Sequence, residues 1–251
     1  METLLPPSQP SENIPAAKRR HWVWIWLKRL FWMIFWLWLG SVLWVVALKW
    51  LPVPGTSLML IRQWSIPNQQ PDKRIYYQWK NLNEISPHLA VAVVAAEDQK
   101  FFQHQGFDWE AIAQAQVYNK TAKIKRGAST ISQQVAKNVF LFPARSYLRK
   151  ALEAYFTVLI ELVWGKKRIL EVYLNIVELG PQTFGVEAAA QRYFRKSALR
   201  IVPEEAAMMA AVLPNPNIFL IQQPNQWVWV RRNAIFYQMQ MLDGTQYLQG
   251  F

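Results

Sequence analysis

The sequence predicts a mainly α-helical domain attached to one N-terminal transmembrane helix. Residues 30–48 contain no charged side chain, which is typical of a membrane span. After residue 83, apolar residues recur at helical spacing behind good N-cap residues. The alternation of apolar and polar residues that indicates strands is nearly absent. With 251 residues and a 52% hydrophobic composition, the chain can bury a substantial core.

The apolar run "LFWMIFWLWLGSVLWVVAL" is long enough to cross a bilayer, because at ~1.5 Å per residue it spans a hydrocarbon core of roughly 30 Å. A core helix of this length in a soluble protein normally shows a polar stripe, and a cleaved signal peptide has a shorter apolar run. We therefore expect an uncleaved signal-anchor helix over residues 21–49. Its flanking Trp22, Trp24 and Trp26 are typical of a membrane interface.

The charges on either side of the span predict its direction. Basic residues precede it at Lys18, Arg19, Arg20, Lys28 and Arg29. Lys49 and Arg62 are the nearest cations after it. Because cytoplasmic flanks carry the excess of Lys and Arg, the N-terminus is predicted to be cytoplasmic and the following domain to lie outside. The proline-rich residues 1–20 are expected to form a disordered tail.

The composition excludes several classes of function. Without cysteine the chain has no disulfide, thiol nucleophile or Cys-ligated metal, and the isolated His21, His88 and His104 do not have the spacing of a metal site. The net charge of +12 implies an anionic partner. No zinc-finger, helix-turn-helix or RNP motif is present, and the domain lies outside, so an anionic lipid surface or a phosphorylated lipid is favoured over nucleic acid.

The exterior region is expected to begin with a connector, residues 50–82, that contains at most one short strand. A domain over residues 83–251 follows. Ser86 and Pro87 suit the N-cap and N1 positions of a helix through Gln99. Asp108 is expected to cap a helix over residues 109–120, and the basic, glycine-ended stretch 119–127 is expected to be a mobile loop.

Further helices are predicted to the end of the domain. Ser129 or Thr130 would cap residues 131–141, and Ser146 would cap residues 147–164. The remaining helical patterns cover residues 166–179, 185–194, 203–213 and 227–242.

Two of these helices concentrate polar residues on one side. Arg149, Lys150 and Glu153 fall within an arc of about 100°, and the opposite arc, with Leu148, Leu152, Tyr155 and Leu159, is expected to face the core. Gln133, Gln134 and Lys137 share a similar arc after a glycine-led turn. Two amides and an ammonium can bind sugar hydroxyls and phosphate. An ordinary solvated helix surface is the alternative in both cases.

Glu97 ends an apolar helix, so desolvation and the negative end of the helix dipole should raise its pKa. A carboxylate tuned in this way is a better general base near neutral pH. Asp98 and His104 would orient it or hold the turn, and Phe101 would pack beneath the site. The alternative is a frayed helix end with exposed acids.

Taken in this order, the segments resemble the glycosyltransferase family 51 domain of peptidoglycan synthesis, in its monofunctional, Gram-negative type. The resemblance covers residues 50–245, and no Ser-x-x-Lys transpeptidase motif follows it. The matching motifs are "EDQKFFQHQG" (97–106), "RGASTISQQVAKN" (126–138), the Arg149, Lys150 and Glu153 group, "ILEVYLN" (169–175) and "GVEAAAQRYF" (185–194).

The resemblance implies a lysozyme-like domain with head and jaw lobes that polymerises lipid II into β-1,4 glycan strands with inversion. It makes Glu97 the general base, Glu153 a second catalytic residue, and the cations Arg126, Lys137, Arg149 and Lys150 the site of the departing diphosphate. Its motifs also imply substrate-binding roles for Asp98, Phe101, His104, Ser129, Thr130, Gln133, Gln134, Asn138 and Asn175. Family analogy allows a divalent cation, Mg or Mn, for which the sequence shows no ligand set.

The expected partners are lipid II, the nascent glycan strand, membrane lipids and other cell-wall synthesis or division proteins, at the bacterial inner membrane with the domain in the periplasm. The apolar "VFLFP" (139–143) and the loop 119–127 are expected to rest on the membrane. Two alternatives stay open. A glycan-cleaving enzyme of the same fold would not need a cationic diphosphate site, and a non-enzymatic scaffold would recruit other synthases through the aromatic anchor.

Overall fold

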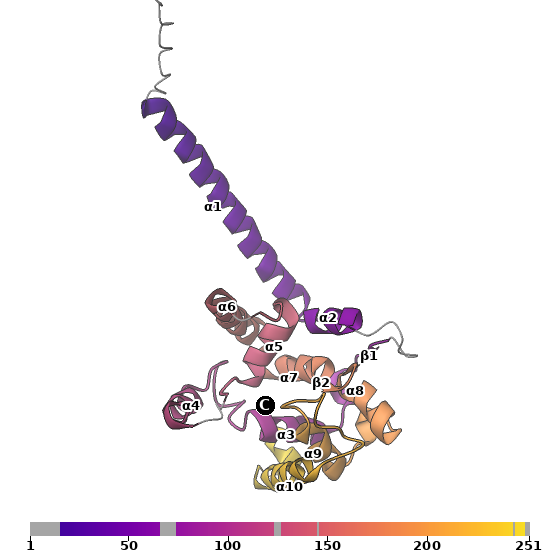
Figure 1. Cartoon of the computed structure of the whole chain (residues 1–251). Coiled ribbons are helices and arrows are strands. Elements are labelled where there is room, and N and C mark those ends of the chain that lie inside the picture. The colour runs from indigo at the N-terminus through magenta and orange to yellow at the C-terminus, as the bar shows by residue number, and fades with distance from the viewer. Residues whose placement is uncertain (1–15, 66–73, 123–126, 145, 243, 249–251) are drawn as a thin grey trace, which may run out of the picture. The chain divides into compact units, whose positions relative to one another are not determined.

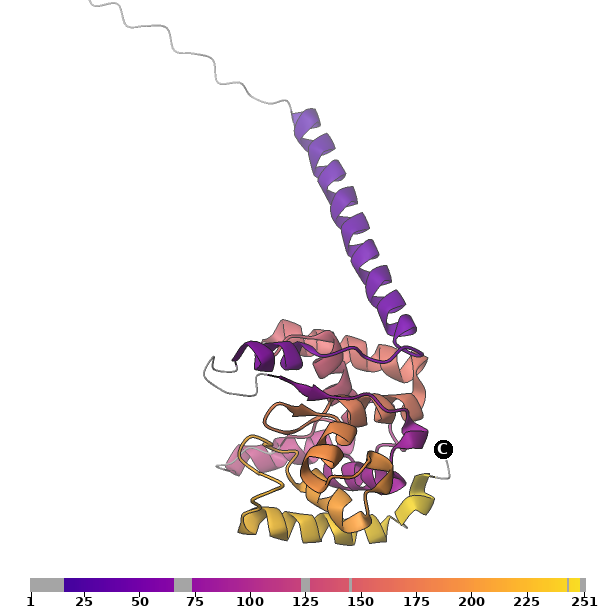
Figure 2. The same ribbon diagram turned by 90° about the vertical axis from the view of Figure 1, so that its right-hand side faces the viewer.

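The computed structural model describes residues 16–65, 74–122, 127–144, 146–242 and 244–248, and helices dominate it (Figures 1 and 2). The predicted mainly α fold is thereby confirmed. The chain divides into two compact units, Met1–Trp44 and Val45–Phe251.

The first unit consists of most of helix α1 (Ala16–Ala47). Its segment Trp24–Ala47 is long and apolar enough to cross a membrane, with a mean hydropathy of 2.0 and 6% of the tested window buried. Residues 1–15 of the predicted tail lie outside the described residues. Residues 16–20, which were also assigned to the tail, are helical instead, as their Ala, Lys and Arg content favours.

The second unit contains nine further α-helices within the described ranges. They are α2 (Ser57–Ser65), α3 (Pro87–Glu97), α4 (Trp109–Thr121), α5 (Ile131–Phe140), α6 (Tyr147–Val163), α7 (Gly165–Ile176), α8 (Val186–Ala189), α9 (Pro203–Ala211) and α10 (Gln226–Met241). Short 3₁₀ turns occur at η1 (Leu82–Glu84), η3 (Ala198–Arg200) and η4 (Gly244–Leu248), and η2 (Ala190–Phe194) is a π-helical turn that continues α8.

Three short strands form one small sheet in the order β1-β3-β2. Strand β1 (Tyr76–Tyr77) runs parallel to β3 (Thr183–Phe184), and β2 (Glu178–Gly180) runs antiparallel to β3. The single strand expected in the connector is therefore present as β1. Strand β2 begins where a helix was predicted to continue to residue 179, because the backbone becomes extended at Val177 and the following residues pair with β3. Strand β3 lies between two predicted helices.

The connector also contains helix α2, which the sequence analysis missed. Prolines on both sides of it favoured an irregular segment, but the hydroxyl of Thr56 accepts a hydrogen bond from the amide of Met59 at 3.3 Å and supports the first turn. Helix α3 ends at Glu97 rather than at Gln99. Three of the four predicted caps are confirmed, since Asp108, Thr130 and Ser146 each accept a hydrogen bond from the backbone amide three residues later. Ser86 stands at the N-cap position of α3, but its side chain makes no capping hydrogen bond.

The helices of the second unit form two groups joined by α7 (Figures 1 and 2). Helix α3 packs against α9 and α10, whereas α5 packs against α6 and α2. Helix α7 contacts both α3 and α5. Residues 89–95 of α3 are each no more than 3% exposed, so the helix that shows no polar face in the sequence is the centre of the core.

Helix α6 is turned differently from the prediction. Leu148 and Leu152 of the arc that was expected to face the core are 72% and 40% exposed, whereas Glu153, Thr157 and Ile160 are buried. The acid-bearing side therefore faces α5. Of the predicted arc, Leu148 and Leu152 face outward, whereas Leu159 packs against the core as expected. Helical periodicity identifies an apolar face but does not say which apolar environment it meets.

The segment "VFLFP" was expected to rest on a membrane, and most of it is packed inside the domain instead. The Phe140 ring stacks on Phe156 with centroids 4.6 Å apart, and Leu141 is buried. Val139 packs against the core cluster as well. Phe142 is 70% exposed, so the outward-facing part of the run is limited to its end.

Candidate active site

Glu97 is the last residue of α3, and its side chain is 18% exposed. The amide nitrogen of Gln134 on α5 donates to Glu97 Oε2 at 2.8 Å, and Arg231 Nη2 of α10 lies 3.7 Å from Oε1. Burial raises the pKa of Glu97, and the Gln134 hydrogen bond and the charge of Arg231 oppose this only in part. The predicted direction of the pKa shift is confirmed.

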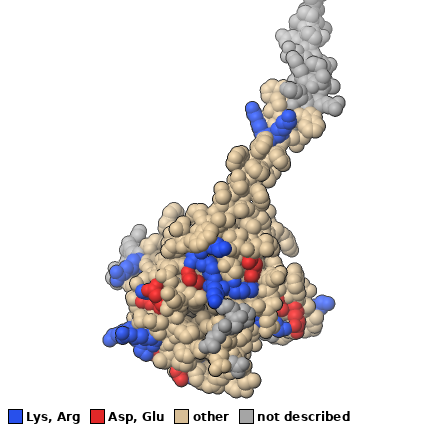
Figure 3. Space-filling model, turned by 180° about the vertical axis from the view of Figure 1, so that it is seen from behind, with Lys and Arg blue, Asp and Glu red and all other residues tan. Residues whose placement is uncertain are grey.

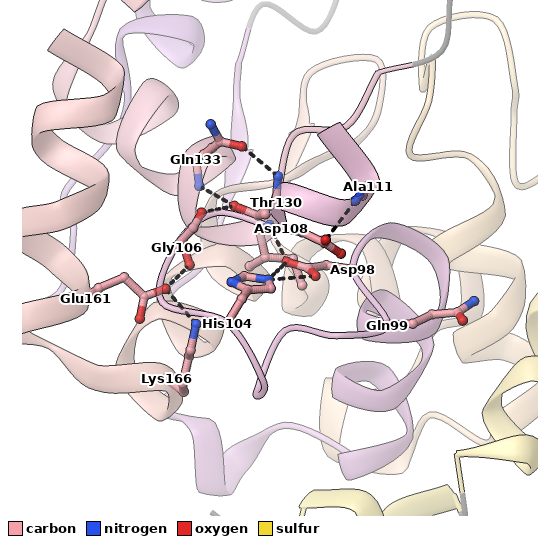
Figure 4. A network of polar contacts seen from close by, with 12 residues as sticks. Asp98, Gln99, His104, Gly106, Asp108, Ala111, Thr130, Gln133, Glu161 and Lys166 are labelled. Atoms are coloured by element: carbon pink, nitrogen blue, oxygen red, sulfur yellow. Dashed lines mark hydrogen bonds and ion pairs between the residues drawn. The ribbon is translucent and has the colours of Figure 1, made fainter. Parts of the chain in front are cut away.

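Asp98 and His104 hold the loop that follows α3 (Figure 4). His104 Nε2 lies 2.9 Å from Asp98 Oδ1, and the backbone amide of Ile131 donates to Asp98 Oδ2 at 3.0 Å. Asp98 is buried, so its carboxylate ties this loop to the start of α5. Of the two roles considered for this pair, the geometry corresponds to holding the turn.

The start of α5 is fixed by a reciprocal cap (Figure 4). Thr130 Oγ1 accepts from the amide of Gln133 at 3.2 Å, and Gln133 Oε1 accepts from the amide of Thr130 at 3.1 Å. The Thr130 hydroxyl donates to the carbonyl of Gly106 at 2.7 Å. Gln133 is buried and used in this cap, so it does not share an open polar face with Gln134 and Lys137 as the sequence suggested.

Gly106 must be glycine for two reasons. Its φ of +87° lies in the left-handed region. A Cβ at this position would also lie 2.8 Å from Cγ2 of Thr157 on α6. The loop of the first motif is thus packed against α6 and bonded to the start of α5.

Lys137 stands one turn after Gln134 and is half-buried. Among the described residues its ammonium has no hydrogen-bond or ion-pair partner. Burial lowers its pKa; the negative charges of Glu153 and Glu97 oppose the shift, and the positive charges of Arg149 and Lys150 add to it. Lys137 therefore interacts electrostatically both with the candidate base and with the charged group on α6.

That charged group consists of Arg149, Lys150 and Glu153. Arg149 Nη1 lies 2.6 Å from Glu153 Oε2, and Lys150 Nζ forms an ion pair with Glu153 Oε1. The Glu153 side chain is 4% exposed, whereas that of Lys150 is 51% exposed. A buried acid thus fixes two cations on the inner side of α6, and the alternative of a merely solvated pair does not describe it.

The remaining predicted residues take different positions. Phe101 is fully buried beneath the Lys166 ammonium, which lies 4.6 Å from its ring centroid. Asn175 is also buried, and its side-chain amide accepts from the backbone amide of Lys80 and donates to the Lys80 carbonyl. Ser129 is exposed and Asn138 is half-buried. Arg126 lies outside the described residues.

Two residues beside Glu97 were missed by the sequence analysis. Arg231 approaches from α10, where the only signal was a pair of arginines in an otherwise apolar and amide-rich helix. Tyr173 lies within the fourth motif on α7, and its hydroxyl donates to Gln134 Oε1 at 3.4 Å. Both come from elements far from Glu97 in sequence.

This arrangement can accept a proton at Glu97 and stabilise a developing anion with the nearby cations. Among the described residues, no three His, Asp or Glu side chains are placed to hold a metal ion.

Residues 65–240 match the family model described as transglycosylase. The chain is 54% identical over 185 residues to the biosynthetic peptidoglycan transglycosylase of Bdellovibrio bacteriovorus, covering 74% of each chain. It is 51% identical over 222 residues to the protein of that name from Ectopseudomonas mendocina, covering 88% of this chain and 90% of the relative. The corresponding protein of Pseudomonas syringae pv. syringae is 48% identical over 200 residues, covering 80% and 85%.

Proposed function

This chain belongs to the transglycosylase family, and on that basis we propose that it polymerises lipid II into the β-1,4 glycan strands of peptidoglycan. The family and its named relatives support the general activity of a peptidoglycan transglycosylase. The observation that carries the finer proposal is the half-buried Lys137 of α5, whose charge acts both on Glu97 and on the Arg149, Lys150 and Glu153 group.

Glu97 would act as the general base. It removes the proton from the 4-hydroxyl of the acceptor's N-acetylglucosamine, and that oxygen attacks C1 of the donor's N-acetylmuramic acid. The bond from C1 to the diphosphate oxygen breaks, the electron pair leaves with undecaprenyl diphosphate, and the configuration at C1 inverts. The raised pKa of Glu97 supports this role, because a base whose pKa is closer to the working pH takes up the proton more readily.

The cations would serve the departing diphosphate. Diphosphate is already a good leaving group, so the protonating acid of a glycosidase can be replaced by fixed positive charge. Lys137, Arg149 and Lys150 supply that charge, and Glu153 holds the latter two in place. Arg126 is proposed as a further cation of this site only because it belongs to the motif at residues 126–138. No step is assigned to a metal ion.

We place the domain at the inner membrane, with the N-terminus in the cytoplasm and the domain in the periplasm. Helix α1 fits a single-pass anchor, and a lipid-linked substrate would then share the plane of the enzyme. The outward apolar arc of α6, at Leu148, Leu152 and Leu162, supports contact with membrane lipids, because apolar surface of this extent usually has a partner.

Nucleic acid is not among the proposed partners. Figure 3 shows Lys and Arg side chains in several groups on one face of the second unit, with Asp and Glu side chains beside most of them. Extended nucleic-acid sites use a more continuous basic stripe than this face carries. The proposed partners are lipid II, the growing strand, membrane lipids and other proteins of cell-wall synthesis or division.

A lipid II polymerisation assay tests the proposal with wild type, Glu97→Gln and the control Glu204→Gln, which alters an exposed carboxylate of α9. We expect Glu97→Gln to lower the rate by about 10²- to 10⁴-fold, the usual contribution of a general base, and the control to match wild type. Finished glycan is tested in parallel. Cleavage without polymerisation would establish the glycan-cleaving alternative, and inactivity of wild type on both substrates would favour the scaffold.

A further inference from the structure

A chain of side chains behind Glu97 connects three helices. Tyr173 of α7 is 1% exposed, and its hydroxyl donates to Gln134 Oε1 of α5 at 3.4 Å. The other end of the same amide, Nε2, donates to Glu97 Oε2 of α3 at 2.8 Å. One glutamine thus stands between a buried phenol and the candidate base.

We propose that Tyr173 is a positioning residue, whose hydroxyl fixes the Gln134 amide so that its NH₂ end faces Glu97 in readiness for proton transfer. This inference rests on the proposed function, in which Glu97 is the base. It assigns no contact between Tyr173 and substrate.

The direction of the amide matters because its two ends favour opposite states of the carboxyl group. The NH₂ end donates and favours ionised Glu97, the form that can accept a proton. The carbonyl end would accept from a protonated carboxyl and favour the form that cannot act as a base. A glutamine that turned freely would therefore divide Glu97 between an active and an inactive form.

Tyr173 can select one direction because its hydroxyl is a permanent donor. Burial and the negative charges of Glu97 and Asp98 raise the pKa of Tyr173 well above its ordinary value, so the phenol keeps its proton at working pH. Among the described residues, Gln134 Oε1 is its acceptor. A reversed amide would leave a buried donor unsatisfied. The 3.4 Å distance is long for a hydrogen bond. The amide direction is therefore selected mainly by the cost of leaving the phenol unpaired in the reversed state, and less by the strength of the bond.

The other groups that act on Glu97 are fixed charges from different elements. Arg231 of α10 and Lys137 of α5 favour its ionised form, whereas Asp98, directly after α3, disfavours it. The Tyr173 hydroxyl is neutral and acts through Gln134. Its removal should therefore move the acid limb of the pH profile and leave these charges unchanged.

The test compares Tyr173→Phe with Tyr193→Phe in the full chain. Phenylalanine keeps the ring and its packing, and the control removes a hydroxyl that donates to Thr183 Oγ1 at 3.2 Å in another part of the domain. For Tyr173→Phe we expect the acid limb of kcat/KM to move to higher pH and kcat to fall roughly 2- to 12-fold, as for the loss of about one hydrogen bond. KM for lipid II should stay unchanged, and Tyr193→Phe should match wild type.

A double-mutant cycle with Gln134→Ala separates positioning from a packing effect. If Tyr173 acts through Gln134, Tyr173→Phe has no further effect on the pH profile once the amide is absent. Additive effects, or a Tyr173→Phe profile that superimposes on wild type, would overturn the inference. Thermal unfolding of each variant reports folding separately from activity.

Failure of the proposed function has a different signature. If Glu97→Gln retains polymerisation, Glu97 is not the base, and the proposed function fails whatever Tyr173→Phe does. If Glu97→Gln is inactive and Tyr173→Phe leaves the pH profile unchanged, the inference about Tyr173 alone fails.

Discussion

Helices α3 and α6 each bring one acid to the site, but they bury opposite kinds of surface. Helix α3 is apolar on all sides and lies in the core, and Glu97 stands at its end, where its contacts are one amide and an arginine 3.7 Å away. Helix α6 turns its acid Glu153 inward against two close cations and most of its leucines outward. One acid is left available for chemistry, and the other is used to fix positive charge.

The comparison shows that an acid in a helix acquires its role from how it is buried. Desolvation with weak pairing raises the pKa of Glu97. The Glu153 side chain is buried more completely, but both of its oxygens form ion pairs, one with Arg149 and the other with Lys150. Five measurements would break or sharpen this comparison.

The largest expected effect separates the two sides of α6. Ile160 is fully buried and Leu162 is 78% exposed, so Ile160→Ala should lower the free energy of unfolding by about 2–5 kcal/mol and Leu162→Ala by less than about 0.5 kcal/mol. Denaturant unfolding in detergent measures both. Equal losses of unfolding free energy in the two variants would show that Leu162 is packed as tightly as Ile160.

Next, Glu153→Ala should destabilise the domain, because it leaves Arg149 and Lys150 together without their acid. Loss of one partner from a buried ion pair removes about 3–5 kcal/mol, and the half-exposed Lys150 side chain reduces our expectation to about 2–3 kcal/mol. Glu204→Ala on α9 is the exposed control. A Glu153→Ala variant as stable as this control would show that the cations do not depend on the acid.

Glu97→Gln should have the opposite effect on stability. The folded pKa of Glu97 is raised above its ordinary 4.5, so ionisation weakens the fold as pH rises through the folded pKa. The neutral amide avoids this loss. We expect a melting temperature a few degrees above wild type at neutral pH and no difference below pH 4.5. A lower melting temperature at neutral pH would contradict burial as the dominant influence on this acid.

A smaller effect concerns the pH profile of polymerisation. Activity should fall at low pH as Glu97 is protonated, above its ordinary 4.5, and at high pH as Lys137 loses its proton, below its ordinary 10.5. Lys137→Arg should move the basic limb upward, because arginine stays charged. An unchanged basic limb in this variant would assign that limb to another group.

The smallest effect tests what the outer arc of α6 meets. The chain has no cysteine, so Leu162→Cys and Glu204→Cys each give one labelling site for an environment-sensitive fluorophore. In reconstituted vesicles the label at position 162 should emit at shorter wavelength than the label at position 204. Identical emission from the two labels would show that this surface of α6 does not contact the membrane.

Local features of the site could be predicted because short-range physics controls them. Asp108, Thr130 and Ser146 act as caps through bonds to amides three residues away. Arg149 and Glu153 meet because four residues bring side chains together on any helix. The raised pKa of Glu97 follows from the apolar sequence that precedes it.

What the sequence by itself determined is therefore most of the helices, three of their caps and the identity of the acid at the end of α3. The tertiary structure alone decided that Arg231 and Tyr173 lie beside Glu97, that Gln133 is used in a cap, and that most leucines of α6 face outward. The physical reason is the range of the interactions. Helical spacing and capping are fixed within a few residues, whereas the side of a helix that meets the core depends on neighbours from distant parts of the chain.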